Sequence, residues 1–177
     1  MFLAINEIKH SKLRYALVIG VMFLISYLVF FLSGLAYGLA QENRMAVDKW
    51  KATDIFLSEK ANDSLNMSMI DSDIASQVKA KEKAVLAQTA GIIYDANNEN
   101  KKNNVSFFGI NSNEFLNPNV IEGRDFKNKG EVVADISFKN QYDYKLGDKI
   151  KLATNNEVLT IVGFTDNAKF NISPVLY

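Results

Sequence analysis

The sequence predicts one long N-terminal transmembrane helix followed by an extracytoplasmic α+β domain. Residues 15–40 form a run of 26 residues without a charged side chain. After Trp50, short apolar runs alternate with turns marked by Gly and Asn, which is typical of short strands around one or two helices. The 177 residues suffice for one modest domain beside the apolar run.

The apolar run is long enough to cross a bilayer. At 1.5 Å per residue it would extend about 39 Å, against a hydrocarbon core of about 30 Å. A cleaved signal peptide is the alternative, because Gly38 and Ala40 have the small size and spacing that cleavage before Gln41 requires. Signal-peptide cores, however, contain only about 7–15 apolar residues. Since no Pro interrupts this part of the chain, we expect an unbroken helix from about Ser11 to near Lys51.

The flanking charges predict the orientation of this helix. Lys9, Lys12 and Arg14 precede it, whereas basic and acidic residues mix after Gln41. The positive-inside bias therefore places the N-terminus in the cytoplasm and residues 51–177 outside the cell membrane. Three regions follow: a cytoplasmic amphipathic elbow at 1–14, the transmembrane helix with its outward extension at 15–50, and the extracytoplasmic domain at 51–177. A frayed N-terminus that only fixes the topology is the alternative to the elbow.

One face of the predicted helix carries polar side chains. At 100° per residue, Ser33 and Tyr37 lie within about 20° of a common line, and Arg44 continues that line. We place Glu42 and Met45 next to it. The alternative is that Ser is tolerated in any span and that Tyr37 belongs to the interfacial aromatic belt.

Gly34 and Gly38 form a G-x-x-x-G pair on the flank of this face. Such pairs allow helix backbones to approach closely, so these two residues are candidates for helix packing.

The region after Trp50 is predicted to alternate strands and turns. We expect a strand at 53–60 and a helix capped by Asp71 that runs to about Lys83. The apolar run 84–96 is followed by a polar, hairpin-like connection at 97–104. Further apolar runs lie at residues 105–111, 119–126, 130–138 and 157–166, and the turn KLGDKI (145–150) lies between the third and the fourth.

No motif in the chain indicates catalysis, a resident cofactor or a metal site. A P-loop is absent, Cys is absent, and the single His10 lies on the predicted cytoplasmic side. Asp71 and Asp73 lack the Gly and the distal Glu of a calcium loop. The acids beside Arg124 are explained by a local turn with a salt bridge. The net charge of zero argues against a nucleic-acid partner. We therefore expect no enzyme.

Four motifs in order resemble one family: VIEGRDF (120–126), GEVVADISF (130–138), YKLGDKIKL (144–152) and LTIVGFTDN (159–167). They resemble the extracytoplasmic core domain of the MacB/FtsX-type ABC transporter permeases. NEIKHSKLRYAL (6–17) looks like the elbow and first membrane helix of that family. LVFFLSGLAYGL (28–39), ATDIFLSEK (52–60) and VGFTDNAKFNISPVLY (162–177) look most like the HrtB-like (DevC-related) hemin-exporter permeases.

The resemblance implies the N-terminal part of a permease subunit in an ABC exporter. Such permeases dimerise in the membrane lipid, pair with an ATPase subunit that binds ATP, and extrude hydrophobic or amphipathic substrates from the outer leaflet. They continue into three further membrane helices, whereas this chain stops at Tyr177. We therefore expect a fragment or a truncated product. Reading the gene past Tyr177 separates this interpretation from a membrane-anchored sensor or interaction domain without transport.

The resemblance and the polar face together suggest hemin as the substrate. Tyr, Met and carboxylate side chains can ligate haem iron, and Arg can pair with a propionate. The candidate contacts are Ser33, Tyr37, Glu42, Arg44 and Met45. A permease of the same family that acts on lipoproteins or antimicrobial peptides is the alternative.

Overall fold

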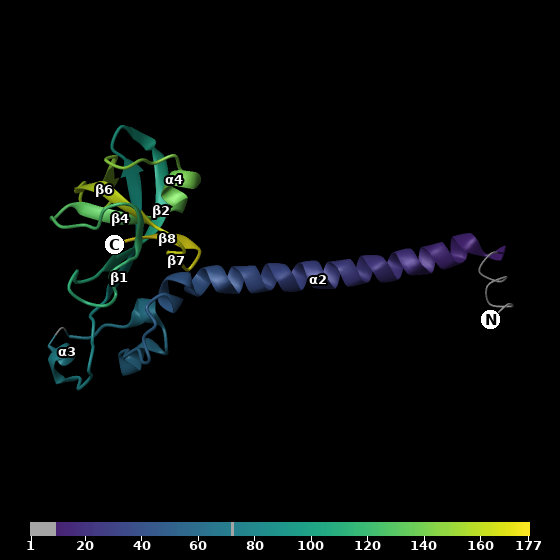
Figure 1. The fold of residues 1–177 in the computed structure, drawn as a ribbon, viewed down its shortest axis with the longest axis horizontal. Helices are drawn as coiled ribbons and strands as arrows, with labels where there is room; N and C mark the ends of the chain where they lie inside the picture. The colour runs from purple at the N-terminus through teal and green to yellow at the C-terminus, as the bar shows by residue number, and fades with distance from the viewer. Residues whose placement is uncertain (1–9, 72) are drawn as a thin grey trace. The chain divides into compact units, whose positions relative to one another are not determined.

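The computed structural model describes residues 10–71 and 73–177. The chain divides into two compact units, Met1–Gln41 and Glu42–Tyr177. Helix α2 runs unbroken from Lys12 to Asp48, as Figure 1 shows, and confirms the predicted long helix within three residues at each end. The elbow predicted at 1–14 falls mainly on residues 1–9, which lie outside the described residues.

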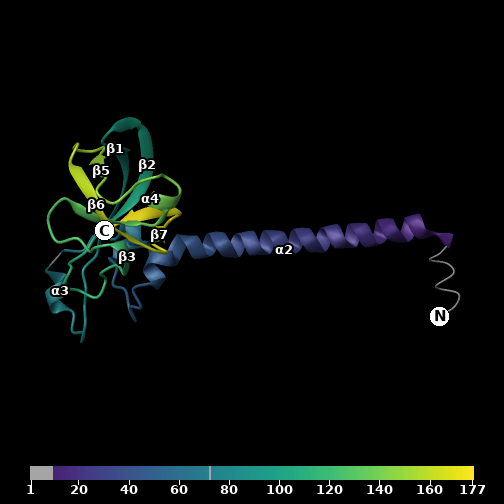
Figure 2. The same cartoon turned by 45° about the horizontal axis from the view of Figure 1, so that its top comes forward.

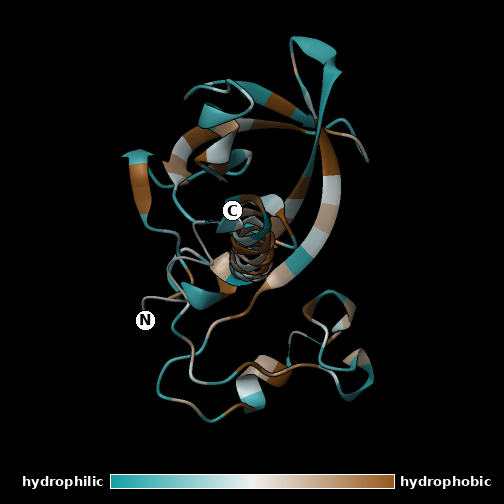
Figure 3. Cartoon of the chain, turned by 90° about the vertical axis from the view of Figure 1, so that its right-hand side faces the viewer, coloured by the Kyte–Doolittle hydropathy of each residue, from teal (hydrophilic) through white to brown (hydrophobic). Residues whose placement is uncertain are grey.

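Helix α2 is apolar on nearly all sides. Its most apolar 18-residue window has a mean hydropathy of 2.5 and is 0% buried by the described chain. Viewed end-on in Figure 3, the helix is coloured mostly as hydrophobic. A fully exposed apolar surface of this length is unfavourable in water and favourable in lipid. By length and composition, α2 can cross a membrane.

The second unit is built from eight strands and several short helical segments, drawn in Figures 1 and 2. The strands are β1 (Ala87–Asp95), β2 (Asn98–Gly109), β3 (Val120–Gly123), β4 (Glu131–Asp135), β5 (Lys149–Leu152), β6 (Val158–Thr165), β7 (Lys169–Phe170) and β8 (Ser173–Leu176). The helical segments are η1 (Glu59–Ala61), η2 (Leu65–Met67), α3 (Ile74–Gln77) and α4 (Ser137–Asn140).

Six of these strands close into a ring. They follow the order β2-β1-β5-β6-β4-β8, and β8 pairs in turn with β2. Closure is parallel, with Ser106 opposite Val175 and Phe107 opposite Leu176. The pair β4–β6 is also parallel, and the other neighbours in the ring are antiparallel. A closed ring leaves the edges of these strands paired, so the second unit is a small barrel with β3 and β7 added outside the ring.

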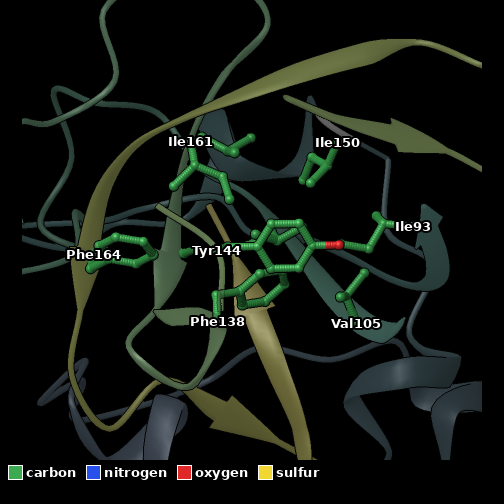
Figure 4. Packing of buried hydrophobic residues seen from close by; sticks show 10 residues of the cluster. Ile93, Val105, Phe138, Tyr144, Ile150, Ile161 and Phe164 are labelled. Carbon is green, nitrogen blue, oxygen red and sulfur yellow. The ribbon is translucent and has the colours of Figure 1, made fainter. Parts of the chain in front are cut away.

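The barrel interior is filled by aromatic and branched side chains. Figure 4 shows the ring of Tyr144 at the centre, with Phe138 beside it and Ile93 and Val105 near its hydroxyl end. The Phe138 and Tyr144 ring centroids are 5.5 Å apart. The Nδ2 of Asn103 donates to the Tyr144 hydroxyl at 3.3 Å, so this buried oxygen has a hydrogen-bond partner.

Strand β2 contributes to two cores because its side chains alternate. Val105 and Phe107 face the barrel interior, whereas Phe108 belongs to a second buried cluster that also contains Ala46 and Trp50. The period of two along a strand sends successive side chains to opposite faces of the sheet. This second cluster is where the end of α2 meets the barrel.

Two glycines let β3 lie directly on β6. Gly123 pairs with Gly163 in the ladder. A Cβ at Gly163 would stand 2.3 Å from the carbonyl oxygen of Arg124, and one at Gly123 would stand 2.4 Å from that of Val162. Gly123 also has a φ of +82°, which other residues rarely adopt. The glycines of the E-G-R and V-G-F motifs are therefore required by a close backbone contact.

The strand predicted at 53–60 is absent from the structure. These residues have no partner in the sheet and lead only into η1. The side chains of Ile55 and Phe56 are 49% and 68% exposed. The apolar pattern was compatible with a strand, but strand formation requires a neighbour to supply the ladder hydrogen bonds.

A helix was predicted from Asp71 to Lys83, but the structure has only the short helix α3 (Ile74–Gln77) in this region. Its N-cap is Asp73, and the helix ends because Val78 is extended. An isolated helix of this length is marginal without packing. The Nζ of Lys83 donates to the carbonyl oxygen of Ala75 at 2.7 Å and so satisfies a group at the helix end.

The polar run at 97–104 was predicted to be a hairpin-like connection. This prediction is wrong for most of the run, because residues 98–104 belong to strand β2. Strand β2 begins at Asn98, so the turn is confined to the residues just before it. The Nζ of Lys101 lies 3.9 Å from the centroid of the Tyr144 ring, and that of Lys102 lies 5.3 Å from the centroid of Tyr94. These contacts hold the polar strand on the barrel, and the tip of this hairpin is hydrophilic in Figure 3.

Glu131 organises the loop between β3 and β4. Its carboxylate accepts two hydrogen bonds from the Arg124 guanidinium, at 2.6 and 2.8 Å. It also accepts from the backbone N–H groups of Lys127 and Asn128. The salt bridge predicted near Arg124 exists, but its partner is Glu131 and not a neighbouring acid. Arg124, followed by these backbone donors, holds the pKa of Glu131 well below its usual range.

We expect the substitution Glu131→Gln to lower the thermal unfolding midpoint of the Glu42–Tyr177 unit by several degrees at pH 7. A carboxyl whose pKa is lowered on folding contributes stability above its unfolded pKa of about 4.3, and this stability is lost as the pH falls. The gap between wild type and variant should therefore narrow below about pH 4 in circular dichroism melts. The variant Glu99→Gln, at an exposed pair with Lys151, is the control. If the difference in unfolding midpoint between wild type and variant does not change with pH, the stabilising role of the ionised Glu131 carboxylate is contradicted.

Candidate functional site

The last turns of α2 and the turn that follows it, at Lys49 and Trp50, present one face to the barrel. Glu42, Met45 and Lys49 are partly buried, and Ala46 is fully buried. Their spacing of three, four and seven residues places them on one side of a helix. We call the contact of this face and Trp50 with Phe108 of β2 and the barrel segment 164–177 the helix–barrel joint. It lies entirely within the Glu42–Tyr177 unit.

Two ion pairs hold the two ends of the joint. The Nζ of Lys169 lies 3.0 Å from Oε1 of Glu42, and the Nζ of Lys49 lies 2.5 Å from Oδ1 of Asp166. Lys49 also donates to the carbonyl oxygen of Asp166. The hydrogen bond from Lys49 to the Asp166 carboxylate holds the pKa of that carboxyl below its ordinary value. The Lys169 side chain is only 19% exposed, so its pair with Glu42 is less screened than a surface pair.

Aromatic side chains fill the joint between the ion pairs. Phe108 is central: its ring centroid lies 5.7 Å from Trp50, 5.5 Å from Phe170 and 5.7 Å from Tyr177. Offset and edge-to-face contacts of this kind add to the hydrophobic stabilisation of the buried rings. Burial raises the pKa of the Tyr177 hydroxyl, with a further contribution from the charge of Asp135.

A hollow of about 230 Å³ lies beside the joint, between the end of α2 and α4. Glu42 and Met45 line it from α2, and Asp135 and Ser137 line it from the β4–α4 junction. The oxygens of Asp135 accept from the backbone N–H groups of Ser137 and Ala168, at 2.9 and 2.8 Å. The buried carboxylate thereby connects two turns of the barrel.

The substrate contacts predicted in the first unit lie on the exposed surface of α2. Tyr37 is 69% exposed, and Ser33 is also exposed. A Cβ added at Gly34 or Gly38 would meet no atom of the described chain within 4 Å. These positions are therefore accessible to another helix or to a ligand.

Glu42 lies on the side of α2 that faces the barrel, away from Arg44. Arg44 pairs with Asp48 at 3.1 Å, and its side chain is 68% exposed. Glu42 instead pairs with Lys169, and both it and Met45 line the hollow. The cause is helix geometry, since two residues turn the helix by about 200° and carry Glu42 away from the face of Arg44. The prediction that Glu42 lies next to the line of Arg44 is wrong, while contact of any of these residues with substrate stays a prediction.

The sequence reasoning missed Lys49, Trp50, Asp166 and Lys169. A signal for the helix side was present, because Glu42, Ala46 and Lys49 share a helical face. Nothing in the sequence paired that face with the segment 166–169. Within residues 10–71 and 73–177, no three His, Asp or Glu side chains come together as a metal site.

A family model for the MacB-like periplasmic core domain matches residues 15–176. The chain belongs to this family. A Staphylococcus epidermidis relative, named as a hemin transport system permease protein, HrtB, is 27% identical over 176 residues. A Staphylococcus haemolyticus relative with the same name is 24% identical. The match covers 99% of this chain and 49% of each relative, so the chain spans about half the length of the curated relatives it matches.

Two solved structures are also similar. The periplasmic region of MacB from Actinobacillus actinomycetemcomitans is 18% identical, with a TM-score of 0.42 over 60% of this chain and 52% of that one. The extracellular domain of the ABC-type transporter YknZ from Gram-positive bacteria is 15% identical, with a TM-score of 0.41 over 55% of this chain and 53% of that one.

We expect a fragment of residues 42–177 to be more stable than one of residues 51–177. The shorter fragment lacks Ala46 and Trp50, both buried in the second cluster. Loss of a buried Trp side chain costs about 3–5 kcal/mol. Urea unfolding followed by circular dichroism measures the difference, with a Trp50→Phe variant of the longer fragment as an intermediate. Equal unfolding midpoints of the two fragments would contradict a stabilising contact between residues 42–50 and the barrel.

We expect Glu42→Lys and Lys169→Glu each to destabilise the joint by about 1 kcal/mol, and the double variant to recover most of the loss. Each single variant puts like charges together, whereas the double variant restores an opposite pair. Trp50 is the only Trp of the chain, so its fluorescence reports on the joint. Arg44→Glu makes a similar charge change on the exposed side of α2 and should leave the emission unchanged. A double variant as unstable as the single variants would contradict a direct ion pair between Glu42 and Lys169.

Proposed function

We propose that the chain is the N-terminal part of the permease subunit of an ABC exporter, working with a separate ATPase subunit and as a homodimer. The observation that carries this proposal is that α2, a helix able to cross a membrane, continues without a break into turns that are fixed to the barrel. Membership of the MacB-like family supports it. The basic residues Lys9, Lys12 and Arg14, which precede the charge-free run, support a cytoplasmic N-terminus and an extracytoplasmic barrel.

In this proposal, α2 transmits movement. An ATP-driven change on the cytoplasmic side would displace the helix, and the joint would oblige the barrel to follow. Coupling of this kind requires contacts that differ between two states. The ion pairs and the buried Trp50 supply contacts at the joint whose loss would uncouple helix and barrel. Gly34 and Gly38, open on the surface of α2, are proposed to pack against a neighbouring helix.

We propose hemin as the favoured substrate, extruded from the outer leaflet. The relatives named as hemin transport permeases support this choice. Tyr37 and Arg44 are exposed and seven residues apart on α2, and Ser33 follows the same line by helical periodicity. Tyr can ligate haem iron, and Arg can pair with a propionate. Met45 and Glu42 are proposed as further contacts only if the hollow opens, because Glu42 is engaged with Lys169.

We expect hemin titrated into the permease encoded by this gene, purified in detergent with its ATPase, to shift the Soret band. The variant Tyr37→Phe should change the shifted spectrum, and Arg44→Gln should weaken binding severalfold. Tyr27→Phe is the matched control, because Tyr27 is also exposed on α2 and lies off the line of Tyr37. Cells that carry the gene should tolerate more hemin than cells without it.

An unshifted band in the wild-type protein, together with equal hemin tolerance, would exclude hemin and leave a lipid or peptide as the substrate. An absence of any associated ATPase would exclude the exporter and favour an anchored interaction domain.

A further inference from the structure

The hollow beside the joint carries an excess negative charge. Glu42, Asp135 and Lys169 line it, so two acidic residues and one basic residue border the hollow. Lys169 is bound to Glu42, while Asp135 is 2% exposed and meets only backbone N–H groups in its described hydrogen bonds. The charge of Asp135 also acts on Tyr177, whose pKa it helps to raise. A cationic group entering the hollow would neutralise this excess.

One wall of the hollow holds a polar group without a partner. Ser137 lines it, is 5% exposed, and its Oγ makes no hydrogen bond to any described residue. A buried hydroxyl without a partner is rare in proteins and calls for a physical reason. A guest with several N–H groups could use Ser137 as an acceptor after a small movement of the wall. This observation is independent of the charge count.

The remaining walls suit a guest with an apolar stem. Met45 and Ile136 line the hollow and are both partly buried. Long cationic side chains bury their methylene groups against such surfaces and keep the charged head in a polar setting. Exposed carboxamides at the rim, whose oxygens can accept further hydrogen bonds, belong to Asn140, Gln141 and Asn167.

We propose that this hollow binds one alkylguanidinium or alkylammonium group, such as an Arg or Lys side chain, with its head near Glu42 and Asp135 and its stem against Met45 and Ile136. At about 230 Å³, the hollow is smaller than the usual small-molecule pocket of roughly 300–1,000 Å³ and matches a guest of this size. The guest shares Glu42 with Lys169, so its binding acts directly on the joint. This inference does not depend on the transport proposal.

The test is a titration of the ¹⁵N-labelled 177-residue chain in detergent micelles with N-acetyl-arginine methylamide. We expect saturable shifts of the side-chain NH₂ signals of Asn140, Gln141 and Asn167. N-acetyl-citrulline methylamide, a neutral analogue of the same shape, should bind at least tenfold more weakly. Equal shifts with both compounds, or shifts that do not saturate, would overturn the proposal.

Two variants locate the guest. Glu42→Gln removes one carboxylate and should weaken binding at least tenfold, whereas Glu99→Gln makes the same change at a distant exposed pair and should not. Ser137→Ala removes only the hydroxyl that has no described partner, leaves the joint intact, and should weaken binding at least threefold. Unchanged affinity in both Glu42→Gln and Ser137→Ala would overturn the assignment.

The source of the cationic group is distinguished by a second compound. Tighter binding of the arginine derivative than of n-butylguanidinium supports a side chain presented by a polypeptide. Equal or tighter binding of n-butylguanidinium supports a free small cation in the same hollow.

Discussion

When β8 pairs with β2, placing Ser106 opposite Val175 and Phe107 opposite Leu176, the sheet closes on itself and acquires an inside and an outside. The alternation along both strands then separates two cores. Phe107 and Leu176 turn to the barrel interior, while Phe108 and Val175 turn to the cluster that receives the end of α2. The surface that holds the helix exists only because this parallel pair forms. The joint, the hollow and the buried position of Trp50 all follow from it.

Features that depend on local pattern could be predicted from the sequence. The charge-free run and the absence of Pro predicted α2, and apolar runs with turn residues predicted most of the barrel strands. Features that depend on partners could not. Residues 53–60 look like a strand but find no neighbour, and the polar start of β2 becomes a strand because β1 and the rings of Tyr94 and Tyr144 hold it. Local propensity is overridden where tertiary contacts are strong or missing.

The joint was hidden from sequence reasoning for the same reason. Glu42 lies 127 residues from Lys169, and Lys49 lies 117 residues from Asp166. No spacing rule links positions so distant, so the charged residues of α2 could be assigned to a helical face but not to partners. The predicted neighbours Glu42 and Arg44 illustrate this limit. One is a buried-side contact and the other belongs to an exposed pair with Asp48.

The two ion pairs of the joint have opposite polarity along the chain, with the acid at Glu42 in α2 and the base at Lys49 in the turn after it. This arrangement is directional. A helix laid in the reverse sense would oppose Lys49 to Lys169 and Glu42 to Asp166, and a slip by one turn would bring uncharged Met45 or Ala46 towards Lys169. The charges therefore favour one direction and one position of the helix end on the barrel. Specificity of this kind matters more than the modest strength of either pair, because it fixes where the helix end contacts the barrel.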